Sequence, residues 1–395
     1  MNEKEFDVVV VGGGPAGATA AHELATSGAR VALLDKNGRI KPCGGAVPPI
    51  LLREFNVPES MLEAKVSSAR MVSPSNCKVD MPIGGFVGMV SRESFDPWLR
   101  ARAGQAGATL IAAKFESMQR LASGLVEISY RPGGKKAETE TLLTRLVIGA
   151  DGAASRVRKQ AMPHEQKMKH VFAYHEIVRS PDAATEQFDP SRCDVYYQSA
   201  VSPDFYGWVF PHGECTSVGT GSAVQGFSLR NSTKCMREKS GLADNEVIRT
   251  EGAPLPLKPL GRWDNGKDTM LIGDAAGAVA PSSGEGIYYA MISGRFAAVA
   301  AQEFLATGNV RALRSTRANF MRHHRLVFLV LGIMQYWWYS SDKRREKFVD
   351  ICRDPDVQKL TWEAYMNKKL VRAKPVAHVR IFFKDLAHLI GIHPR

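Results

Sequence analysis

Three glycines near the start of the chain have a spacing that suits phosphate binding. Gly12, Gly14 and Gly17 form a GxGxxG pattern between an apolar run, residues 6–11, and an alanine-rich segment that ends near Gly28. In such a pattern the first glycine permits a tight turn, the second lets the backbone approach a pyrophosphate, and the third lets helix and strand pack closely. The N–H groups at the start of the helix would then face the phosphate. The spacing predicts a dinucleotide site, and the alternative is a glycine-rich turn without a ligand.

The elements around these glycines form a βαβ unit. Residues 6–11 are rich in valine, as expected for a parallel strand that is buried on both faces. Residues 30–35 form a second strand, and Asp35 at its end can accept hydrogen bonds from a ribose diol. Ala16 in the turn and Lys36 after the strand are further candidate cofactor contacts. The motif alone does not distinguish FAD from NAD.

Two later segments each place an acidic residue after a strand and before a helix. In residues 146–158, a strand ends at Asp151 and a basic helix start follows. In residues 270–291, a strand ends at Gly273 and Asp274, and a glycine-rich loop then opens a helix. Taken alone, Gly273 and Asp274 also fit an ordinary cap at the end of a strand, so their meaning depends on the other two segments.

Together with GxGxxG, these two segments resemble a family of FAD-dependent enzymes that includes aromatic hydroxylases and geranylgeranyl reductases. The resemblance implies that Asp274 binds the ribityl chain of FAD. It also implies that the loop containing Pro281, Gly284 and Gly286 brings backbone N–H groups and a helix N-terminus beside the flavin ring. A positive helix end at that position stabilises negative charge on the reduced flavin.

The segment 91–99, SRESFDPWL, also fits this family. The resemblance implies that Arg92 starts a helix that reaches toward the cofactor, and the alternative is a simple helix start capped by Ser91. No second strand–GxGxxG–helix unit occurs in the sequence. A nicotinamide cofactor would therefore dock transiently against the flavin, as the resemblance implies.

Two further segments narrow the resemblance to the geranylgeranyl reductases. Residues 41–47 read KPCGGAV, and residues 206–211 read YGWVFP. Over nearly the whole chain the sequence is similar to the photosynthetic branch, which reduces the geranylgeranyl chain of chlorophylls or bacteriochlorophylls to phytyl. At this chain length the sequence resembles the bacteriochlorophyll type more than the longer plant type. The resemblance implies FAD and NADPH as cofactors and a geranylgeranyl-bearing pigment or diphosphate as substrate. It places five candidate catalytic residues in the two segments: Cys43, Gly44, Gly45, Tyr206 and Trp208.

The candidate catalytic residues have a physical rationale of their own. Tyr206 and Trp208 are two residues apart, so on a strand they point to the same face. An aromatic wall suits a flexible isoprenoid, although the core of a sheet would explain these side chains equally well. Cys43 lies beside two glycines, so its thiol can approach a ligand closely and donate a proton.

Other functions share parts of this pattern. A flavin monooxygenase acting on an aromatic or polyene substrate would use the same FAD segments, and oxygen uptake coupled to the substrate would identify it. A reductase of geranylgeranyl diphosphate or another prenyl lipid would share both motifs. A prenyl-binding escort without activity would lack a flavin spectrum.

The composition limits the remaining classes of protein. The chain has 395 residues, of which 44% are apolar, an ordinary fraction for a globular protein. Its six cysteines form no CxxC pair and no HExxH pattern occurs, so we predict no metal site. The acidic first residues do not resemble a signal peptide, and we expect a cytoplasmic protein.

Basic charge is concentrated toward the C-terminus. Residues 311–395 hold 18 basic and 7 acidic residues, a net charge of +11, whereas the first 310 hold 34 and 33. The apolar run at 326–339 is shorter than the roughly 20 residues that span a bilayer. It predicts an interfacial helix flanked by basic residues, with a buried core helix as the alternative. We therefore expect peripheral association with an anionic photosynthetic membrane and no nucleic-acid partner.

The expected fold class is α/β. A doubly wound FAD-binding domain would be assembled from residues 1–165 and 261–310, and part of 70–92 fits either this domain or the next. Residues 166–260 consist of short alternating runs separated by turns, which predict an inserted antiparallel substrate domain with one face over the flavin. Residues 311–395 would form a helical, basic region.

Overall fold

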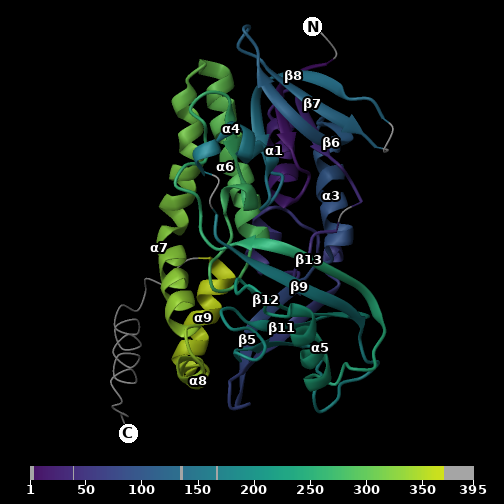
Figure 1. The fold of residues 1–395 in the computed structure, drawn as a ribbon, viewed down its shortest axis with the longest axis vertical. Helices are drawn as coiled ribbons and strands as arrows, with labels where there is room; N and C mark the ends of the chain where they lie inside the picture. The colour runs from purple at the N-terminus through teal and green to yellow at the C-terminus, as the bar shows by residue number, and fades with distance from the viewer. Residues whose placement is uncertain (1–3, 39, 134–136, 166–167, 369–395) are drawn as a thin grey trace. The chain divides into compact units, whose positions relative to one another are not determined.

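The computed structural model describes residues 4–38, 40–133, 137–165 and 168–368. They divide into two compact units, each built from three separate stretches of chain (Figure 1). The first unit comprises Met1–Ile40, Arg92–His170 and Pro254–Arg325, and the second comprises Lys41–Ser91, Val171–Ala253 and Leu326–Arg395.

The first unit is built on a six-stranded sheet with a parallel centre. Its strands are β1 (Glu5–Val11), β2 (Val31–Asp35), β6 (Thr109–Arg120), β7 (Val126–Pro132), β8 (Glu140–Gly149) and β14 (Thr269–Leu271). Five of them pair in parallel in the order β6-β2-β1-β8-β14, and β7 is antiparallel to β6 and β8. The four valines at 8–11 are at most 2% exposed, as a central strand buried on both faces requires.

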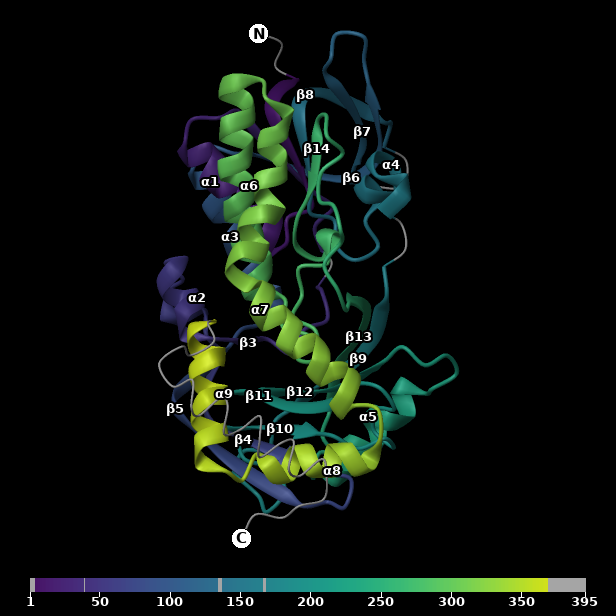
Figure 2. The same cartoon turned by 90° about the vertical axis from the view of Figure 1, so that its left-hand side faces the viewer.

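Helices and short 3-10 turns complete the first unit. They are α1 (Pro15–Thr26), α3 (Arg92–Gln105), α4 (Arg156–Ala161), η2 (Pro163–Glu165), η3 (Gly273–Ala276), α6 (Ile287–Thr307) and η4 (Val310–Arg314). Pro15 suits the first position of α1 because a proline lacks the N–H that would have no partner there. α1 and α6 lie side by side (Figures 1 and 2). They can approach closely because Gly294 has no Cβ, and a Cβ at this position would overlap the carbonyl oxygen of Ala16.

The second unit is built on an eight-stranded sheet in the order β13-β9-β12-β11-β10-β4-β5-β3. Its strands are β3 (Ala46–Val47), β4 (Ala64–Val72), β5 (Lys78–Met89), β9 (His170–Arg179), β10 (Arg192–Tyr196), β11 (Gly207–His212), β12 (Cys215–Ser222) and β13 (Val247–Pro256). β10 and β4 are parallel, whereas β9, β12, β11 and β10 are successively antiparallel. The register places Gly219 of β12 between Trp208 of β11 and His175 of β9.

Helices cover parts of this second sheet. They are α2 (Pro49–Glu54), η1 (Glu59–Met61), α5 (Leu229–Lys239), α8 (Asp342–Ile351) and α9 (Pro355–Asn367), and α7 (Ser315–Trp338) ends in this unit after beginning in the first. Met236 of α5 joins a buried cluster with Val178, Val209 and Val218 of three neighbouring strands. This cluster defines the face of the sheet that α5 covers.

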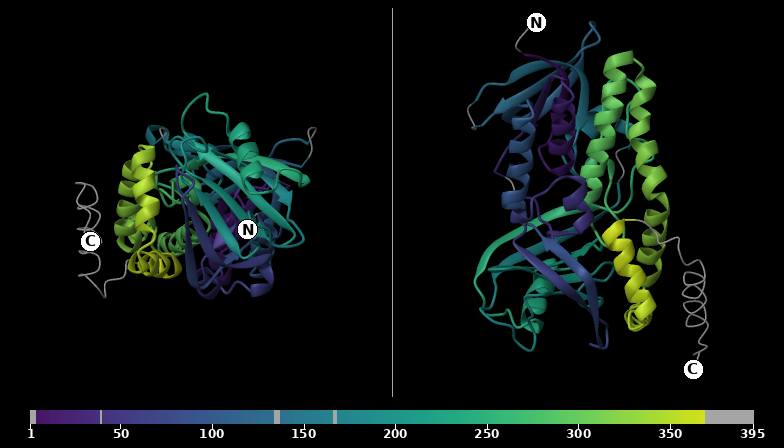
Figure 3. Two further views of the ribbon diagram at one scale, coloured as in Figure 1. Left: turned by 90° about the horizontal axis from the view of Figure 1, so that it is seen from below. Right: turned by 180° about the vertical axis from the view of Figure 1, so that it is seen from behind.

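The last described helices, α8 and α9, lie against β5 (Figures 2 and 3). Arg345 of α8 is 1% exposed and donates hydrogen bonds to the carbonyl oxygens of Ser202 and Pro203. Trp362 of α9 packs against the buried cluster that includes Met89 of β5. α8 and α9 therefore belong to the packed structure of the second unit.

The expected fold class is confirmed: the chain is α/β, with two sheets and a helical C-terminal region. The bounds of the units differ from the expected domain bounds: residues 254–260 and 311–325 fall in the first unit, and the largest difference is at residues 41–69. Residues 41–69 were expected with the FAD-binding segments, but β3 and β4 are strands of the second sheet, in which β4 pairs with β10. Local sequence does not reveal this pairing, because the partner strand is far along the chain. Across the residues that the structure describes, no helix is long and apolar enough to cross a membrane.

Candidate functional site

The glycine loop of the first unit combines two crowded positions with one open position. Gly12 has a φ of +106°, and a Cβ there would overlap the carbonyl oxygen of Ala150. A Cβ on Gly17 would overlap the carbonyl oxygen of Gly12. At Gly14, by contrast, the nearest atom to a Cβ would be Nη2 of Arg92, 3.8 Å away. The loop therefore leaves space beside Gly14, directly before the N-terminus of α1, where an anion is favoured.

Asp35 holds the glycine loop in place. Its carboxylate accepts hydrogen bonds from the backbone N–H of Gly13 at 2.6 Å and of Asn37 at 2.9 Å. An ionised carboxylate offers about four acceptor sites, so Asp35 retains capacity for hydroxyl groups of a ligand. Lys36 follows it and is exposed.

Arg92 lies where the sequence predicts, at the start of α3 and near the glycine loop. It is 7% exposed and forms a two-pronged ion pair with Asp96, with both N–O distances 2.6 Å. Because Asp96 fixes the guanidinium, a positive charge is held near the open space at Gly14. Such a fixed cation suits a phosphate-bearing group.

The segment after β14 joins the same region of the first unit. A Cβ on Gly273 would lie 2.8 Å from the Cβ of Ala16, so the start of α1 and this turn are in contact. Asp274 is 7% exposed, and its Oδ1 lies 3.8 Å from where a Cβ of Gly286 would be. The loop that contains buried Pro281 and half-buried Gly284 ends at Gly286, after which α6 begins.

Asp151 is engaged in capping α4. Its carboxylate accepts hydrogen bonds from Ser155 Oγ at 2.5 Å and from the backbone N–H of Arg156 at 2.6 Å and Val157 at 3.1 Å. Burial raises the pKa of Asp151 and outweighs these hydrogen bonds, which lower it. A direct contact of Asp151 with a cofactor stays a prediction.

The sequence did not single out Arg158, which links two predicted cofactor segments. This residue of α4 is 2% exposed and donates hydrogen bonds to the carbonyl oxygens of Ala153, at 2.9 Å, and Ala275, at 3.1 Å. Arg158 thereby ties the Asp151 turn to the turn that carries Asp274. The basic helix start after Asp151 was the available signal, but it did not indicate which carbonyls the guanidinium would reach.

The residues of the first unit fit a dinucleotide cofactor. Gly14 leaves room for a pyrophosphate beside a helix N-terminus, and Asp35 and Asp274 supply acceptors for hydroxyl groups. Across the described part of the chain, no three His, Cys, Asp or Glu side chains gather as a metal site would need.

In the second unit, the two sequence motifs that are far apart in the chain lie together. Trp208, Phe210 and His212 alternate along β11 and share one face. The loop at 43–45 lies over this face: a Cβ on Gly44 would be 2.9 Å from Phe210 Cδ2 and 3.9 Å from Trp208 Nε1. Gly45 has a φ of +73°, and a Cβ there would overlap the ring of His212.

His212 was not predicted from the sequence, and it fixes the loop. Its Nε2 lies 3.1 Å from the carbonyl oxygen of Gly44, which can only accept, so Nε2 carries the proton. Burial lowers the pKa of His212 to about 4, and the imidazole is therefore neutral near pH 7. The signal in the sequence was its spacing, four residues after Trp208 on the same strand.

Cys43 and Tyr206 belong to the two sequence motifs that meet at this face. Cys43 is half-buried, and its Sγ accepts a hydrogen bond from the backbone N–H of Gly45 at 3.4 Å. The ring of Tyr206 stacks on Phe205 with centroids 4.4 Å apart and meets Trp208 edge-on at 6.0 Å. The five candidate catalytic residues thus lie together within one unit.

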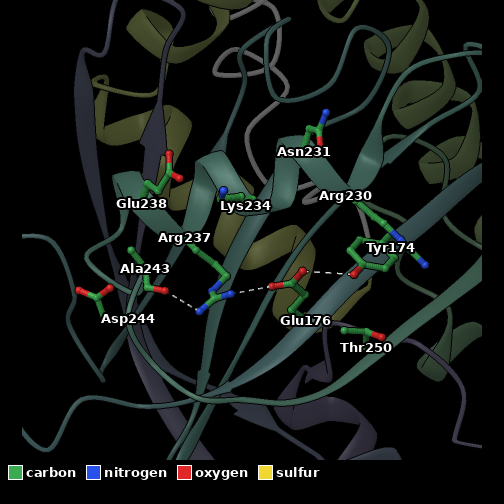
Figure 4. Close-up of a pocket in the computed structure, with 10 residues that line it drawn as sticks. All are labelled: Tyr174, Glu176, Arg230, Asn231, Lys234, Arg237, Glu238, Ala243, Asp244 and Thr250. Carbon is green, nitrogen blue, oxygen red and sulfur yellow. Dashed lines mark hydrogen bonds and ion pairs between the residues drawn. The ribbon is translucent and has the colours of Figure 1, made fainter.

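A cavity of about 590 Å³ lies on the other face of the same sheet (Figure 4). Tyr174 and Glu176 line it and alternate with His175 along β9, so they point away from the face that carries Trp208. Arg237 of α5 donates to Glu176 at 3.1 Å and to the carbonyl oxygen of Ala243 at 2.8 Å. The polar side chains at the centre of this cavity are paired with one another, and none of the predicted site residues lines it.

Known proteins resemble the chain in sequence and fold. A family model described as lycopene cyclase protein matches residues 7–384. The geranylgeranyl diphosphate reductase of Rhodobacter capsulatus is 53% identical over 393 residues, which cover 99% of each chain. The chloroplastic geranylgeranyl diphosphate reductase of Oryza sativa subsp. japonica is 35% identical over 98% of this chain and 87% of its own. A structure from Thermoplasma acidophilum, titled geranylgeranyl bacteriochlorophyll reductase-like, has a TM-score of 0.80 at 23% identity, covering 95% of this chain and 99% of that one.

These matches extend over both units. Two relatives exceed 30% identity over almost the whole chain, and the structural likeness supports the same fold. The resemblance inferred from KPCGGAV and YGWVFP is thereby confirmed, as is the expected enzyme class. The chain belongs to the geranylgeranyl reductase family, whose members are flavin-dependent oxidoreductases.

Proposed function

We propose that this protein hydrogenates carbon–carbon double bonds of a geranylgeranyl chain, with FAD bound by the first unit and NADPH as the reductant. The observation that carries the proposal is the loop at 43–45 seated over Trp208, Phe210 and His212. Cys43 directly precedes Gly44, so the loop that carries the thiol lies over an aromatic surface. Aromatic side chains suit a substrate chain that offers large apolar area and no polar group.

The reaction requires a hydride on one alkene carbon and a proton on the other. When bound, FAD supplies the hydride chemistry. The double bond is isolated from any carbonyl group, so protonation must accompany hydride addition to limit charge at carbon. We assign the proton to the Cys43 thiol, directly or through a water. The N–H of Gly45 at Sγ would stabilise the thiolate that remains, which must be reprotonated before the next double bond is reduced.

The preferred substrate is the geranylgeranyl chain of a chlorophyll or bacteriochlorophyll, which would be reduced to phytyl. The name of the Thermoplasma structure mentions bacteriochlorophyll, whereas the names of the Rhodobacter and rice relatives mention geranylgeranyl diphosphate. All of these names share the geranylgeranyl chain, and the aromatic face of β11 has features suited to that chain rather than to either head group.

Product analysis tests the proposal. The purified protein is incubated without oxygen with NADPH and either geranylgeranylated pigment or geranylgeranyl diphosphate, and the prenyl chains are analysed by mass spectrometry. We expect a gain of two hydrogens per reduced double bond, ending at phytyl, with the pigment as the better substrate. A faster reaction with the diphosphate would reassign the substrate. Oxygen uptake with a hydroxylated product would replace the reductase proposal with a monooxygenase.

We also propose that the protein works at the cytoplasmic surface of an anionic photosynthetic membrane. One face of α7 exposes four apolar side chains, 55–82% accessible, at helical spacing: Leu326, Leu329, Ile333 and Tyr336. Exposed basic residues flank this stripe: Arg322, Arg325 and Lys343. Each basic residue near an anionic surface contributes about 1 kcal/mol. Trp338 and Tyr339 are 9% and 6% exposed, so these aromatics are part of the core rather than the exposed stripe.

Vesicle co-sedimentation tests the membrane proposal. We expect binding to anionic vesicles that high salt weakens only in part, because the apolar stripe contributes a salt-insensitive term. Replacing Leu329 and Ile333 with Ser should remove that remainder. Ile248→Ser is the matched control, since this residue is 45% exposed on β13. Equal binding to neutral and anionic vesicles would contradict the proposal.

A further inference from the structure

A chain of buried polar side chains crosses four neighbouring strands on the Trp208 face of the second sheet. Nε1 of Trp208 on β11 lies 3.0 Å from Oγ of Ser217 on β12. The same Oγ lies 2.9 Å from Nδ1 of His175 on β9, and His175 Nε2 lies 2.8 Å from Oε2 of Glu251 on β13. Neither the sequence motifs nor the proposed chemistry assigns a role to Ser217, His175 or Glu251.

The chemistry of the two ends fixes the direction of the two end hydrogen bonds. An indole N–H can only donate and an ionised carboxylate can only accept. Trp208 therefore donates to Ser217, and His175 Nε2–H donates to Glu251. When the Ser217 hydroxyl donates to Nδ1 of His175, every hydrogen in the chain has an acceptor. Hydrogen bonds that run in the same direction polarise one another, so side chains linked in this way are held more firmly than in separate pairs.

The packing around this chain confines the indole. Trp208, His175 and Ser217 are 5%, 2% and 0% exposed. Gly219 separates Trp208 from His175 in the register, and a Cβ there would overlap Cζ2 of Trp208. The absence of that Cβ lets the indole lie across β12, with its ring centroid 6.3 Å from that of His175.

Neither end of this hydrogen-bonded chain is a group that could deliver a proton to a substrate. Its inner end is the indole N–H of Trp208, which does not act as an acid near neutral pH, and no proton can pass through it. Its outer end is Glu251, whose Oε1 lies 2.9 Å from Arg249 Nε. Arg249 holds Glu251 at one end, and the indole N–H of Trp208 is bound at the other. This arrangement is suited to orienting the indole ring.

We propose that Ser217 and His175 are positioning residues that fix the indole of Trp208. The fixed indole in turn determines the position at which the isoprenoid chain is held for each successive reduction. The inference deepens the proposed function and rests on it. If Ser217 is replaced by Ala, the indole N–H loses its acceptor in a buried site and the ring is free to shift. The substrate chain should then leave before all double bonds are reduced.

The first experiment reads the indole directly and needs no substrate. Protein labelled with ¹⁵N at the tryptophan side chains is examined by NMR, and Trp208→Phe assigns the Nε1–H signal. In Ser217→Ala we expect this signal to move upfield and to exchange faster with solvent. Ser222→Ala is the matched control, because Ser222 is a buried serine of the same strand whose hydroxyl bonds to Asp204 instead. An unmoved signal in Ser217→Ala would overturn the inference.

The second experiment reads the products. Ser217→Ala should raise the ratio of partly reduced to fully reduced chains about fivefold, the effect of losing one hydrogen bond. In a Trp208→Phe background the same change should add nothing, because the N–H is already absent. His175→Gln, whose amide can still donate to Glu251 and accept from Ser217, should keep both the NMR signal and the products near normal.

The outcomes separate the two proposals. A shifted indole signal with an unchanged product ratio would overturn the link between Trp208 and the stopping position. A product effect that persists in the Trp208→Phe background would also overturn it. A shifted signal in a protein that reduces no geranylgeranyl substrate would instead contradict the proposed function and leave the hydrogen-bonded chain as found.

Discussion

Gly12 and Gly17 in the first unit and Gly44 in the second are required for different physical reasons. In the first unit, backbone carbonyl oxygens of Ala150 and Gly12 occupy the space that a Cβ on Gly12 or Gly17 would need. In the second unit, the ring of Phe210 occupies the corresponding space at position 44, whereas at position 45 the ring of His212 and the backbone carbonyl oxygen of Val90 both do. The first loop is therefore limited by the backbone of a βαβ unit, and Gly44 of the second loop is limited by a side chain of β11.

This difference predicts that the two loops tolerate change differently. A loop shaped by backbone atoms recurs wherever the same turn occurs, so its spacing is informative in any sequence. Position 44 of the second loop depends on a side chain more than 160 positions away, and either residue can change if the other compensates. The following experiments test this comparison, beginning with the largest expected effect.

Gly14→Val should abolish FAD binding without unfolding the protein. The nearest atom to a Cβ at this position is 3.8 Å away, so the side chain fits the folded chain but fills the space that a pyrophosphate would use. Asp35→Ala should weaken binding only about 10-fold, because it removes hydrogen bonds and adds no clash. The flavin content of the purified proteins decides the matter, and full occupancy in Gly14→Val would contradict the placement.

Gly17→Val is the contrasting variant within the same loop. Its Cβ would overlap the carbonyl oxygen of Gly12, which belongs to the backbone and has nowhere to move. We therefore expect this protein to fail to fold rather than to fold without FAD. Circular dichroism distinguishes the two variants, and a folded Gly17→Val protein would show that the backbone of this loop adapts.

Cys43→Ala should lower product formation by about 100-fold, the scale of general acid catalysis. Cys43→Ser retains a hydroxyl donor and should lose less. Both proteins should bind FAD and accept hydride from NADPH at normal rates, because neither step uses this proton. Stopped-flow measurement of flavin reduction beside product analysis separates the steps. Near-normal phytyl formation in Cys43→Ala would leave water as the proton donor.

The sequence predicted the first loop more completely than the second. The valine run, the glycine spacing and Asp35 follow from local pattern, and the structure contains the corresponding strand, helix and hydrogen bonds. KPCGGAV and YGWVFP were connected only through a resemblance, because no local pattern indicates that Gly44 lies over Phe210. Pairing of distant strands is a property of the whole sheet, which is also why His212 and the assignment of residues 41–69 were missed.

Acid should destabilise the second loop through His212. The pKa of this imidazole is lowered by burial to about 4, whereas an unfolded chain has a value near 6.5. Below pH 6.5 the unfolded state binds a proton that the folded state does not, so the free energy of unfolding falls as the pH falls. The loss contributed by His212 should approach about 3 kcal/mol near pH 4.

A variant isolates this contribution from the other titrating groups. His212→Gln can still donate a hydrogen bond to Gly44 but does not titrate. The difference in free energy of unfolding between the native protein and this variant, measured by denaturant titration from pH 7 to pH 4, should change in favour of the variant. A difference that is independent of pH would mean that the folded protein accommodates a charged imidazole.

Gly44→Ala should have the smallest effect of these substitutions, and a second substitution should reverse most of it. Its Cβ would lie 2.9 Å from Phe210 Cδ2, so the ring must move, and crowding of this kind costs about 1 to 3 kcal/mol. Phe210→Leu removes the ring edge and should recover most of the loss in the double variant, in both unfolding free energy and product yield. Flavin content should stay unchanged throughout. No second-site change could similarly rescue Gly17→Val, because its obstacle is a backbone oxygen. If Phe210→Leu gives no recovery, the ring of Phe210 is not what limits position 44, and the distinction between the two loops fails.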